Sequence, residues 1–192
     1  AQKPAKFLGF DIFIRRSNDL RKDINGKTIR SLGHVPVLYL NYETMRKKLF
    51  DYKAARIAVE NGKEIWKSIV RTYMIDLDDL EIVSQFNAEI RGFYNYYSIA
   101  NNSPAINSFY HIMSYSMYKT FARKYKSSVK KILFQYKKDG TFKVAYENSK
   151  GKTLYQSFYH DGFKRKKIAG ATSCDTIPRT VTITGGRNSL ME

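Results

Sequence analysis

The chain has 192 residues, enough for one domain or two small ones, and 43% of them are hydrophobic, so it can bury a core. Lys plus Arg is 34 against 17 acidic residues, and the resulting net charge of +17 favours a polyanionic partner. The basic residues are spread over several expected elements, which argues against a single amphipathic membrane-surface helix. No apolar run reaches the length of about 18 residues that predicts a membrane span.

The single cysteine, Cys174, excludes an intrachain disulfide and a Cys-rich zinc site. It fits a reducing compartment, and both a bacterial cytoplasm and a mitochondrion meet that condition. The chain starts at Ala1-Gln2-Lys3-Pro4 without an initiator Met or a signal-peptide core. We therefore expect it to be part of a longer protein.

A β-hairpin is predicted near the N-terminus. Residues 6–15 alternate between apolar and polar side chains, Asn25-Gly26 is a turn signal, and residues 27–32 suit a returning strand. Two strands alone are marginally stable in water, so we expect the hairpin to pack on a neighbour that precedes it.

Three amphipathic helices follow, because apolar residues recur at three- and four-residue spacing over 41–60, 77–101 and 104–127. Asn61-Gly62 is expected to end the first helix and Asp76 to cap the second. Pro104 suits the first turn of the third.

The character of the chain changes near residues 128–140. A short basic helix is predicted over 129–138, then strands at 142–146, 154–159 and 180–184. We expect an α+β fold that is mainly α, in three parts: a β-hairpin (1–35), a three-helix unit (36–128) and a small basic α/β segment (129–192).

The sequence offers little for catalysis. Asp76, Asp78 and Asp79 precede a helix, so capping is favoured over metal binding, and Tyr73 lies too far from them for a Tyr-x-Asp-Asp motif. The histidines lack Cys or acidic partners at ligand spacing, so no metal site is predicted. These are His34, His111 and His160.

Residues 91–97, Arg-Gly-Phe-Tyr-Asn-Tyr-Tyr, combine stacking faces, an amide and a cation, as RNA recognition does. Arg91 and Asn95 share a helix face, and we favour a contact with RNA or a structural network for this pair. For Phe93 and Tyr97, packing in the core is an equal alternative.

Several motifs resemble those of group II intron reverse transcriptases, also called maturases. Phe7-Leu8-Gly9-Phe10 is similar to their last palm motif. Residues 81–97, read as Glu-Ile-Val-x-x-Phe-Asn-x-x-x-Arg-Gly-x-x-Asn-Tyr-Tyr, resemble the signature of their thumb, or X domain, and 120–127 resemble the end of its next helix. The match covers about residues 5–135. Phe86 stands where the family often has Tyr, and Phe121 where Leu is common.

The resemblance implies a three-helix thumb bundle over 36–128, after the end of the palm and before a DNA-binding region. The family copies intron RNA into DNA with Mg2+, and it helps the intron splice by stabilising an RNA that performs the chemistry with its own metal ions. The chain lacks the catalytic Tyr-x-Asp-Asp. We therefore expect no catalytic residue, cofactor or polymerase activity in these 192 residues, and primer extension by the purified chain would contradict this.

The expected partners are group II intron RNA, a template–primer duplex, target DNA, and the fingers and palm of the same protein, with no membrane. The predicted RNA-binding residues lie on the helices and the signature segment: Arg46, Lys47, Lys48, Lys53, Arg56, Arg91, Asn95, Tyr96, Asn101, Lys119, Arg123, Lys124, Lys126, Lys130 and Lys131. The predicted DNA-binding residues form one basic run: Lys164, Arg165, Lys166 and Lys167.

Two other classes remain open from the sequence. One is a stand-alone nucleic-acid-binding module without catalysis, which shares the charge. The other is a self-contained nuclease, which needs a cluster of carboxylates or histidines that the sequence does not assemble.

Overall fold

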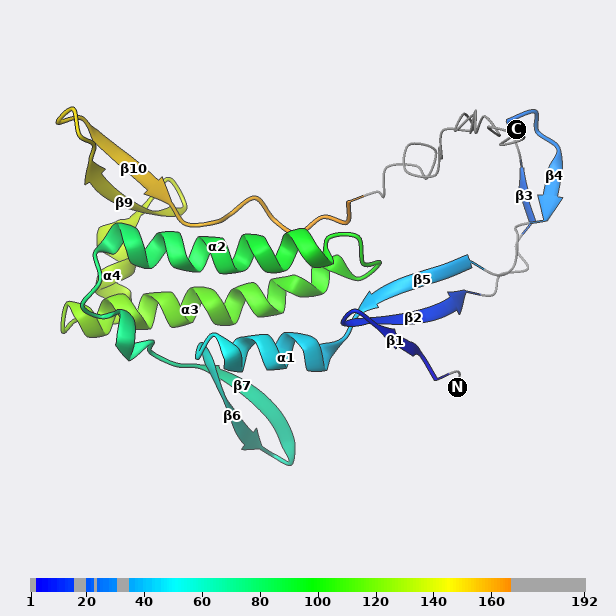
Figure 1. The fold of residues 1–192 in the computed structure, drawn as a ribbon, viewed down its shortest axis with the longest axis horizontal. Helices are drawn as coiled ribbons and strands as arrows, with labels where there is room; N and C mark the ends of the chain where they lie inside the picture. Colours follow the sequence, from blue (N-terminus) through cyan, green and yellow to red (C-terminus); the bar gives the residue numbers. More distant parts are fainter. Residues whose placement is uncertain (1–2, 16–19, 23, 31–34, 167–192) are drawn as a thin grey trace, which may run out of the picture.

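The computed structural model describes residues 3–15, 20–22, 24–30 and 35–166. These residues form a mixed α/β structure with four α-helices and several small antiparallel sheets (Figure 1). Helices α2 (Asp79–Tyr97) and α3 (Ile106–Lys124) lie side by side in opposite directions, and α1 (Tyr42–Asp51) and α4 (Val129–Tyr136) pack against α3. Within the described ranges, no helix is long and apolar enough to cross a membrane.

The predicted N-terminal strand is two strands, β1 (Ala5–Phe7) and β2 (Phe10–Arg15), joined by a two-residue turn. The partner predicted for it, residues 27–32, is wrong. β2 pairs instead with β5 (Val35–Leu40), because six residues of β5 match its whole length and set Leu40 beside Phe10 in the core. The Asn25-Gly26 signal lies in the turn of a separate small hairpin, β3 (Leu20–Lys22) with β4 (Thr28–Arg30).

The helix predicted over 41–60 is also wrong in its second half. After α1 ends at Asp51, the chain forms a hairpin of β6 (Ala55–Glu60) and β7 (Lys63–Ser68) that projects from the helices (Figure 1). Asn61 and Gly62 have φ values of 51° and 73°, which suit a two-residue hairpin turn rather than a helix end. Val59, placed on the apolar stripe by the helical spacing, is 70% exposed.

The two central helices were predicted well. Asp78, not Asp76, is the N-cap of α2, and its backbone N–H donates to the Glu81 carboxylate at 3.3 Å. A 3-10 turn, η1 (Thr72–Met74), precedes α2, and a second, η2 (Ser103–Ala105), holds Pro104 and leads into α3. The facing sides of α2 and α3 are buried as the apolar spacing predicts, with Phe86, Ile90, Phe93, Ile106, Met113, Met117 and Phe121 in the core. Phe109, which the spacing did not single out, is also fully buried, whereas its neighbour Tyr110 is only partly buried.

The C-terminal part packs on the same core. After α4 the chain forms β8 (Lys137–Lys138), β9 (Thr141–Glu147) and β10 (Thr153–Ser157), in the order β10-β9-β8. Its apolar side chains join the cluster of α2 and α3: Phe142, Val144, Phe158, Tyr159 and Phe163. The three-part division of the chain stays a prediction. The predictions for His34, Lys167, Cys174 and 180–184 lie outside the described residues.

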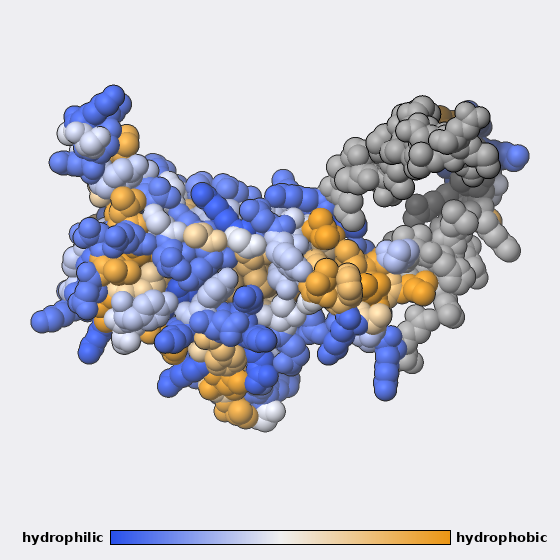
Figure 2. Space-filling model, in the orientation of Figure 1, coloured by the Kyte–Doolittle hydropathy of each residue, from blue (hydrophilic) through white to orange (hydrophobic). Residues whose placement is uncertain are grey.

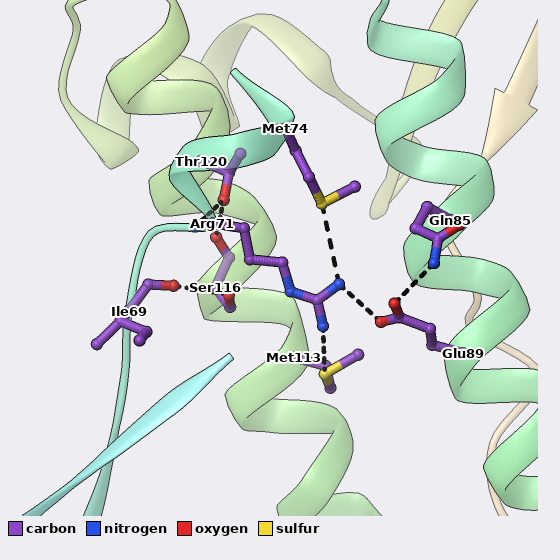
Figure 3. A network of polar contacts seen from close by, with 8 residues as sticks. All are labelled: Ile69, Arg71, Met74, Gln85, Glu89, Met113, Ser116 and Thr120. Atoms are coloured by element: carbon purple, nitrogen blue, oxygen red, sulfur yellow. Dashed lines mark hydrogen bonds and ion pairs between the residues drawn. The ribbon is translucent and has the colours of Figure 1, made fainter. Parts of the chain in front are cut away.

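A buried ion pair fixes the link between β7 and α2 (Figure 3). Arg71 is 1% exposed, and its Nη1 lies 2.7 Å from Oε2 of Glu89 on α2. Its guanidinium also lies 4.1 Å from the centre of the Phe86 ring, and Nη2 contacts Met113 Sδ at 3.4 Å. The Arg71 backbone N–H donates to Thr120 Oγ1 at 3.1 Å, so one residue contacts both central helices.

We predict that Arg71→Met lowers the free energy of unfolding by about 3–5 kcal/mol, because it leaves the Glu89 carboxylate buried without its cation. The double variant Arg71→Met/Glu89→Leu removes both charges and should lose clearly less. Urea unfolding of the two variants beside the wild type measures this. Equal losses in the single and double variants would show that packing, not the unpaired charge, dominates.

Candidate nucleic-acid interface

Residues 91–97, which we call the signature segment, form the last two turns of α2, and their side chains point in three directions. Phe93 and Tyr97 point into the core, where Phe93 stacks on Phe109 with ring centres 4.3 Å apart. Burial raises the pKa of the Tyr97 hydroxyl above its ordinary value. Of the two alternatives for these aromatics, the structure therefore shows core packing.

Tyr96 points toward the turn between β1 and β2. Its ring stacks on Phe10 with centres 5.7 Å apart, and its hydroxyl donates to the Leu8 carbonyl at 2.9 Å. The side chain keeps 49% of its surface exposed. Tyr96 therefore ties the Phe-Leu-Gly-Phe motif to the signature helix and still presents an aromatic edge to solvent.

Gly9 in this turn has φ of 80°, and a Cβ built on it would lie 2.5 Å from the Tyr97 hydroxyl oxygen. Thr44 Oγ1 donates to the Gly9 carbonyl at 3.3 Å. The Phe-Leu-Gly-Phe motif and the thumb signature thus meet in space, and glycine is required by both the backbone angle and the close approach.

Arg91 and Asn95 point away from the core on the third side of α2, and both are exposed. They meet the segment that follows β10, residues 158–166, which runs along α2 toward its C-terminal end (Figure 1). Lys166 Nζ donates to Asn95 Oδ1 at 3.3 Å, and the Arg91 guanidinium lies 5.9 Å from the centre of the Tyr159 ring. Burial raises the pKa of Tyr159; the Asp161 carboxylate adds to the shift, and Arg91 opposes it.

The loop after α2 is hydrogen-bonded to the backbone of β5. Asn102 exchanges two hydrogen bonds with the Leu40 backbone, at 2.7 and 3.0 Å, and the Asn101 N–H donates to the Leu38 carbonyl at 2.7 Å. Asn101 Oδ1 is buried and has no hydrogen-bond partner among the described residues. The loop thereby acts as an additional partner for the end of β5.

The predicted cations of the first helix divide between α1 and the hairpin. Arg46 pairs with Glu64 at 3.0 Å and Glu43 at 3.3 Å, so its charge is largely neutralised. Lys48 and Lys53 lie over the rings of Tyr52 and Tyr73. Lys47 is exposed on α1, and Arg56 lies opposite Lys67 on the hairpin, so the structure does not bring these cations onto one helix face.

A second group of cations surrounds the turn from α3 to α4, and we call it the α3 site. Its members are Lys119, Arg123, Lys126, Lys130 and Lys131. The first three line a groove of about 480 Å³ together with Val70, Ala122, Ser127 and Val129. Figure 2 shows many hydrophilic residues over the helices, and hydrophobic ones gather over the sheet of β1, β2 and β5 and over the β6–β7 hairpin.

Most of the charge of the α3 site is free. Lys119 Nζ donates to the Ser68 carbonyl at 2.7 Å, which orders the side chain without cancelling its charge. In the part of the chain that the structure describes, none of the five cations of this site has a carboxylate partner. This arrangement suits a phosphate backbone.

The ammonium group of Lys124, which was also predicted to bind RNA, is held by contacts within the fold. It pairs with Asp79 at 2.7 Å, and Asp79 also accepts hydrogen bonds from the hydroxyls of Tyr125 and Tyr136. Burial, followed by Tyr125 and Asp79, raises the pKa of Tyr136. Asp79 thus joins α2, α3 and α4.

The described residues contain no cluster of His, Cys, Asp or Glu that could hold a metal ion.

Several anchoring residues were missed by sequence reasoning. Asn87 is buried on α2, donates to the Ser157 carbonyl at 2.9 Å and accepts from the Tyr159 N–H at 2.8 Å. Tyr94 donates to the Lys164 carbonyl at 2.7 Å. The position of Asn87 beside the apolar stripe of α2 was the available signal of a buried polar contact. Its partners could not be identified from the sequence, because they lie about 70 residues further along the chain.

We predict that Gly9→Ala lowers the free energy of unfolding more than Gly62→Ala. Both residues occupy a hairpin turn with positive φ, but a Cβ at Gly62 meets nothing within 4 Å. Each variant loses about 1–2 kcal/mol from the left-handed backbone, and only Gly9→Ala also displaces Tyr97. Urea unfolding measures both losses. In a Tyr97→Phe background, which lacks the hydroxyl, the difference between Gly9→Ala and Gly62→Ala should become smaller. If the difference is the same in the wild-type and Tyr97→Phe backgrounds, the Tyr97 hydroxyl has no steric role.

Comparison with known proteins agrees with the sequence motifs. The family model for type II intron maturase matches residues 39–172. The chain is 35% identical over 153 residues to the group II intron-encoded protein LtrA of Lactococcus lactis subsp. cremoris, which covers 79% of this chain and 25% of the relative. It is 30% identical over 136 residues to a Saccharomyces cerevisiae protein named for COX1/OXI3 intron 1, with 65% and 15% covered.

The chain thus spans about a quarter or less of the length of these curated relatives. The family match lies across α1 to α4, the β9–β10 hairpin and the residues that meet α2 after it. The chain belongs to the type II intron maturase family.

Proposed function

We propose that this chain is the thumb region of a group II intron maturase and that it binds intron RNA to stabilise the splicing-active fold. The α3 site is the observation that carries this proposal. Three of its cations line one groove at the end of the helix pair, two more lie on the adjoining α4, and none of the five has a carboxylate partner within the described residues. Such a surface binds phosphates and releases their counterions.

Phosphate contacts hold an RNA in position but do not read its sequence, so further groups must supply selectivity. The exposed edge of Tyr96 and the side chains of Arg91 and Asn95 are available on α2, at the opposite end of the antiparallel pair from the α3 site. A helix of 19 residues is about 28 Å long, so the two ends contact separate parts of one folded RNA. The same helices would hold a template–primer duplex during reverse transcription in the longer protein.

We predict that Arg123→Gln/Lys126→Gln weakens binding of a structured group II intron RNA. The slope of log affinity against log salt should fall by about 1.4–1.8, because each lost phosphate contact removes about 0.7–0.9. Filter binding of the 192-residue chain across a salt series measures this. Lys150→Gln/Lys152→Gln, in the turn between β9 and β10, is the charge-matched control. An equal decrease in the control would mean that net charge, not the α3 site, sets the affinity.

Stabilisation of the RNA fold is a separate expectation with its own measurement. Saturating wild-type chain should lower the Mg2+ concentration at which the intron RNA reaches half of its native protection from hydroxyl radicals, because binding to the folded state shifts the equilibrium toward it. The Arg123→Gln/Lys126→Gln variant should lower it less. Binding without any shift would leave only a general cationic RNA-binding module.

A further inference from the structure

The signature helix and the segment after β10 present their cations on one face. Arg91 and Asn95 of α2 are exposed there, as are Lys164, Arg165 and Lys166. Lys166 Nζ lies 3.3 Å from Asn95 Oδ1 and 5.1 Å from the centre of the Tyr94 ring. Two parts of the sequence that are about 70 residues apart are therefore in direct contact.

The basic segment is held in place by its backbone. The Tyr94 hydroxyl donates to the Lys164 carbonyl at 2.7 Å, and the Lys166 N–H donates to the Ser98 carbonyl at 2.8 Å. Upstream of this basic segment, the buried Asn87 side chain makes two hydrogen bonds to the backbone of Ser157 and Tyr159. Because folding has already ordered this segment, a ligand that binds its side chains loses less conformational entropy.

Aromatic side chains complete the attachment. Phe158, Tyr159 and Phe163 are buried, and the Tyr94 ring meets Phe163 edge to face at 5.3 Å. The Tyr110 hydroxyl of α3 donates to the Tyr159 carbonyl at 2.7 Å. The basic residues thus follow directly from a segment that belongs to the hydrophobic core.

The face carries an excess of positive charge. Among the described residues, neither Arg91 nor any of the three cations at 164–166 forms an ion pair with a carboxylate. Asp161 is the acidic group whose charge acts on the neighbouring Tyr159, and it offsets one of the four cations. The complementary ligand is a polyanion.

We propose that Arg91, Asn95, Lys164, Arg165 and Lys166 form one binding site for the phosphate backbone of RNA, which we call the α2 site. This proposal rests on the RNA-binding function proposed above and extends it. It differs from the expectation that the basic run contacts target DNA, and the experiment below compares the two ligands. Arg91 adds a planar fork and Asn95 an amide, groups that recognise the exposed edges and hydroxyls of folded RNA.

The test compares two variants of the 192-residue chain, Lys164→Gln/Lys166→Gln and Arg91→Gln/Asn95→Ala. Hydroxyl-radical footprinting on the structured intron RNA and binding to a DNA duplex of similar length are the readouts. We expect each variant to weaken RNA binding and to expose the same nucleotides, and the lysine variant to lower the salt slope by about 1.4–1.8. Lys150→Gln/Lys152→Gln is again the matched control, and circular dichroism verifies that each variant is folded.

Three results would overturn the α2 site: exposure of different nucleotides by the two variants, an effect of the lysine variant on DNA but not on RNA, or no effect beyond that of the control. RNA binding by the wild-type chain and by the α3-site variant separates this outcome from failure of the proposed function. If Arg123→Gln/Lys126→Gln still weakens RNA binding, the proposed function stands without the α2 site. If the wild-type chain does not bind the RNA at all, both fail.

Discussion

The buried pair of Arg71 and Glu89 is the constraint on which the helix pair depends. A guanidinium withdrawn from water needs its carboxylate, so the chain between β7 and α2 has one position that satisfies both charges. Met113 and Thr120 of α3 contact the same residue, which fixes the spacing of the two central helices. The α3 site lies at the end of this pair, and its Lys119 is ordered by the Ser68 carbonyl just upstream of Arg71.

The signature helix shows how one short segment serves packing and surface chemistry together. Phe93 packs it on α3, Tyr96 and Tyr97 contact the β1–β2 turn and Phe10, and Arg91 with Asn95 faces the segment after β10. Six of the seven residues at 91–97 contact one of these neighbours, and the exception is Gly92, where an added Cβ would meet nothing within 4 Å. A sequence pattern that resembles an RNA-binding motif is therefore also the structural joint between the N-terminal sheet, the helix pair and the C-terminal segment.

The central helices could be predicted because the spacing of their apolar residues is a local signal, although the N-cap of α2 is Asp78 rather than the expected Asp76. The helix expected over 41–60 failed because the spacing up to Tyr52 continued by chance into β6, while the Asn61-Gly62 turn suits a hairpin equally well. The partner of β2 and the anchoring of residues 158–166 depend on contacts between distant parts of the chain. The spacing of apolar residues carries no information on such pairs. Arg91, Asn95 and the basic run at 164–166 could therefore be singled out in the sequence, but their contact with one another could not be predicted.

The distance along the chain between α2 and its last partners has a consequence for biosynthesis. Asn87 meets Ser157 and Tyr159, which are 70 and 72 residues further on. At about 5–20 residues per second, a ribosome needs roughly 4–14 s to supply them after Asn87 has been added. During that time the Asn87 amide lacks its backbone partners and the helix pair lacks the packing of Phe158, Tyr159 and Phe163, so this region is then most open to chaperones and to misfolding.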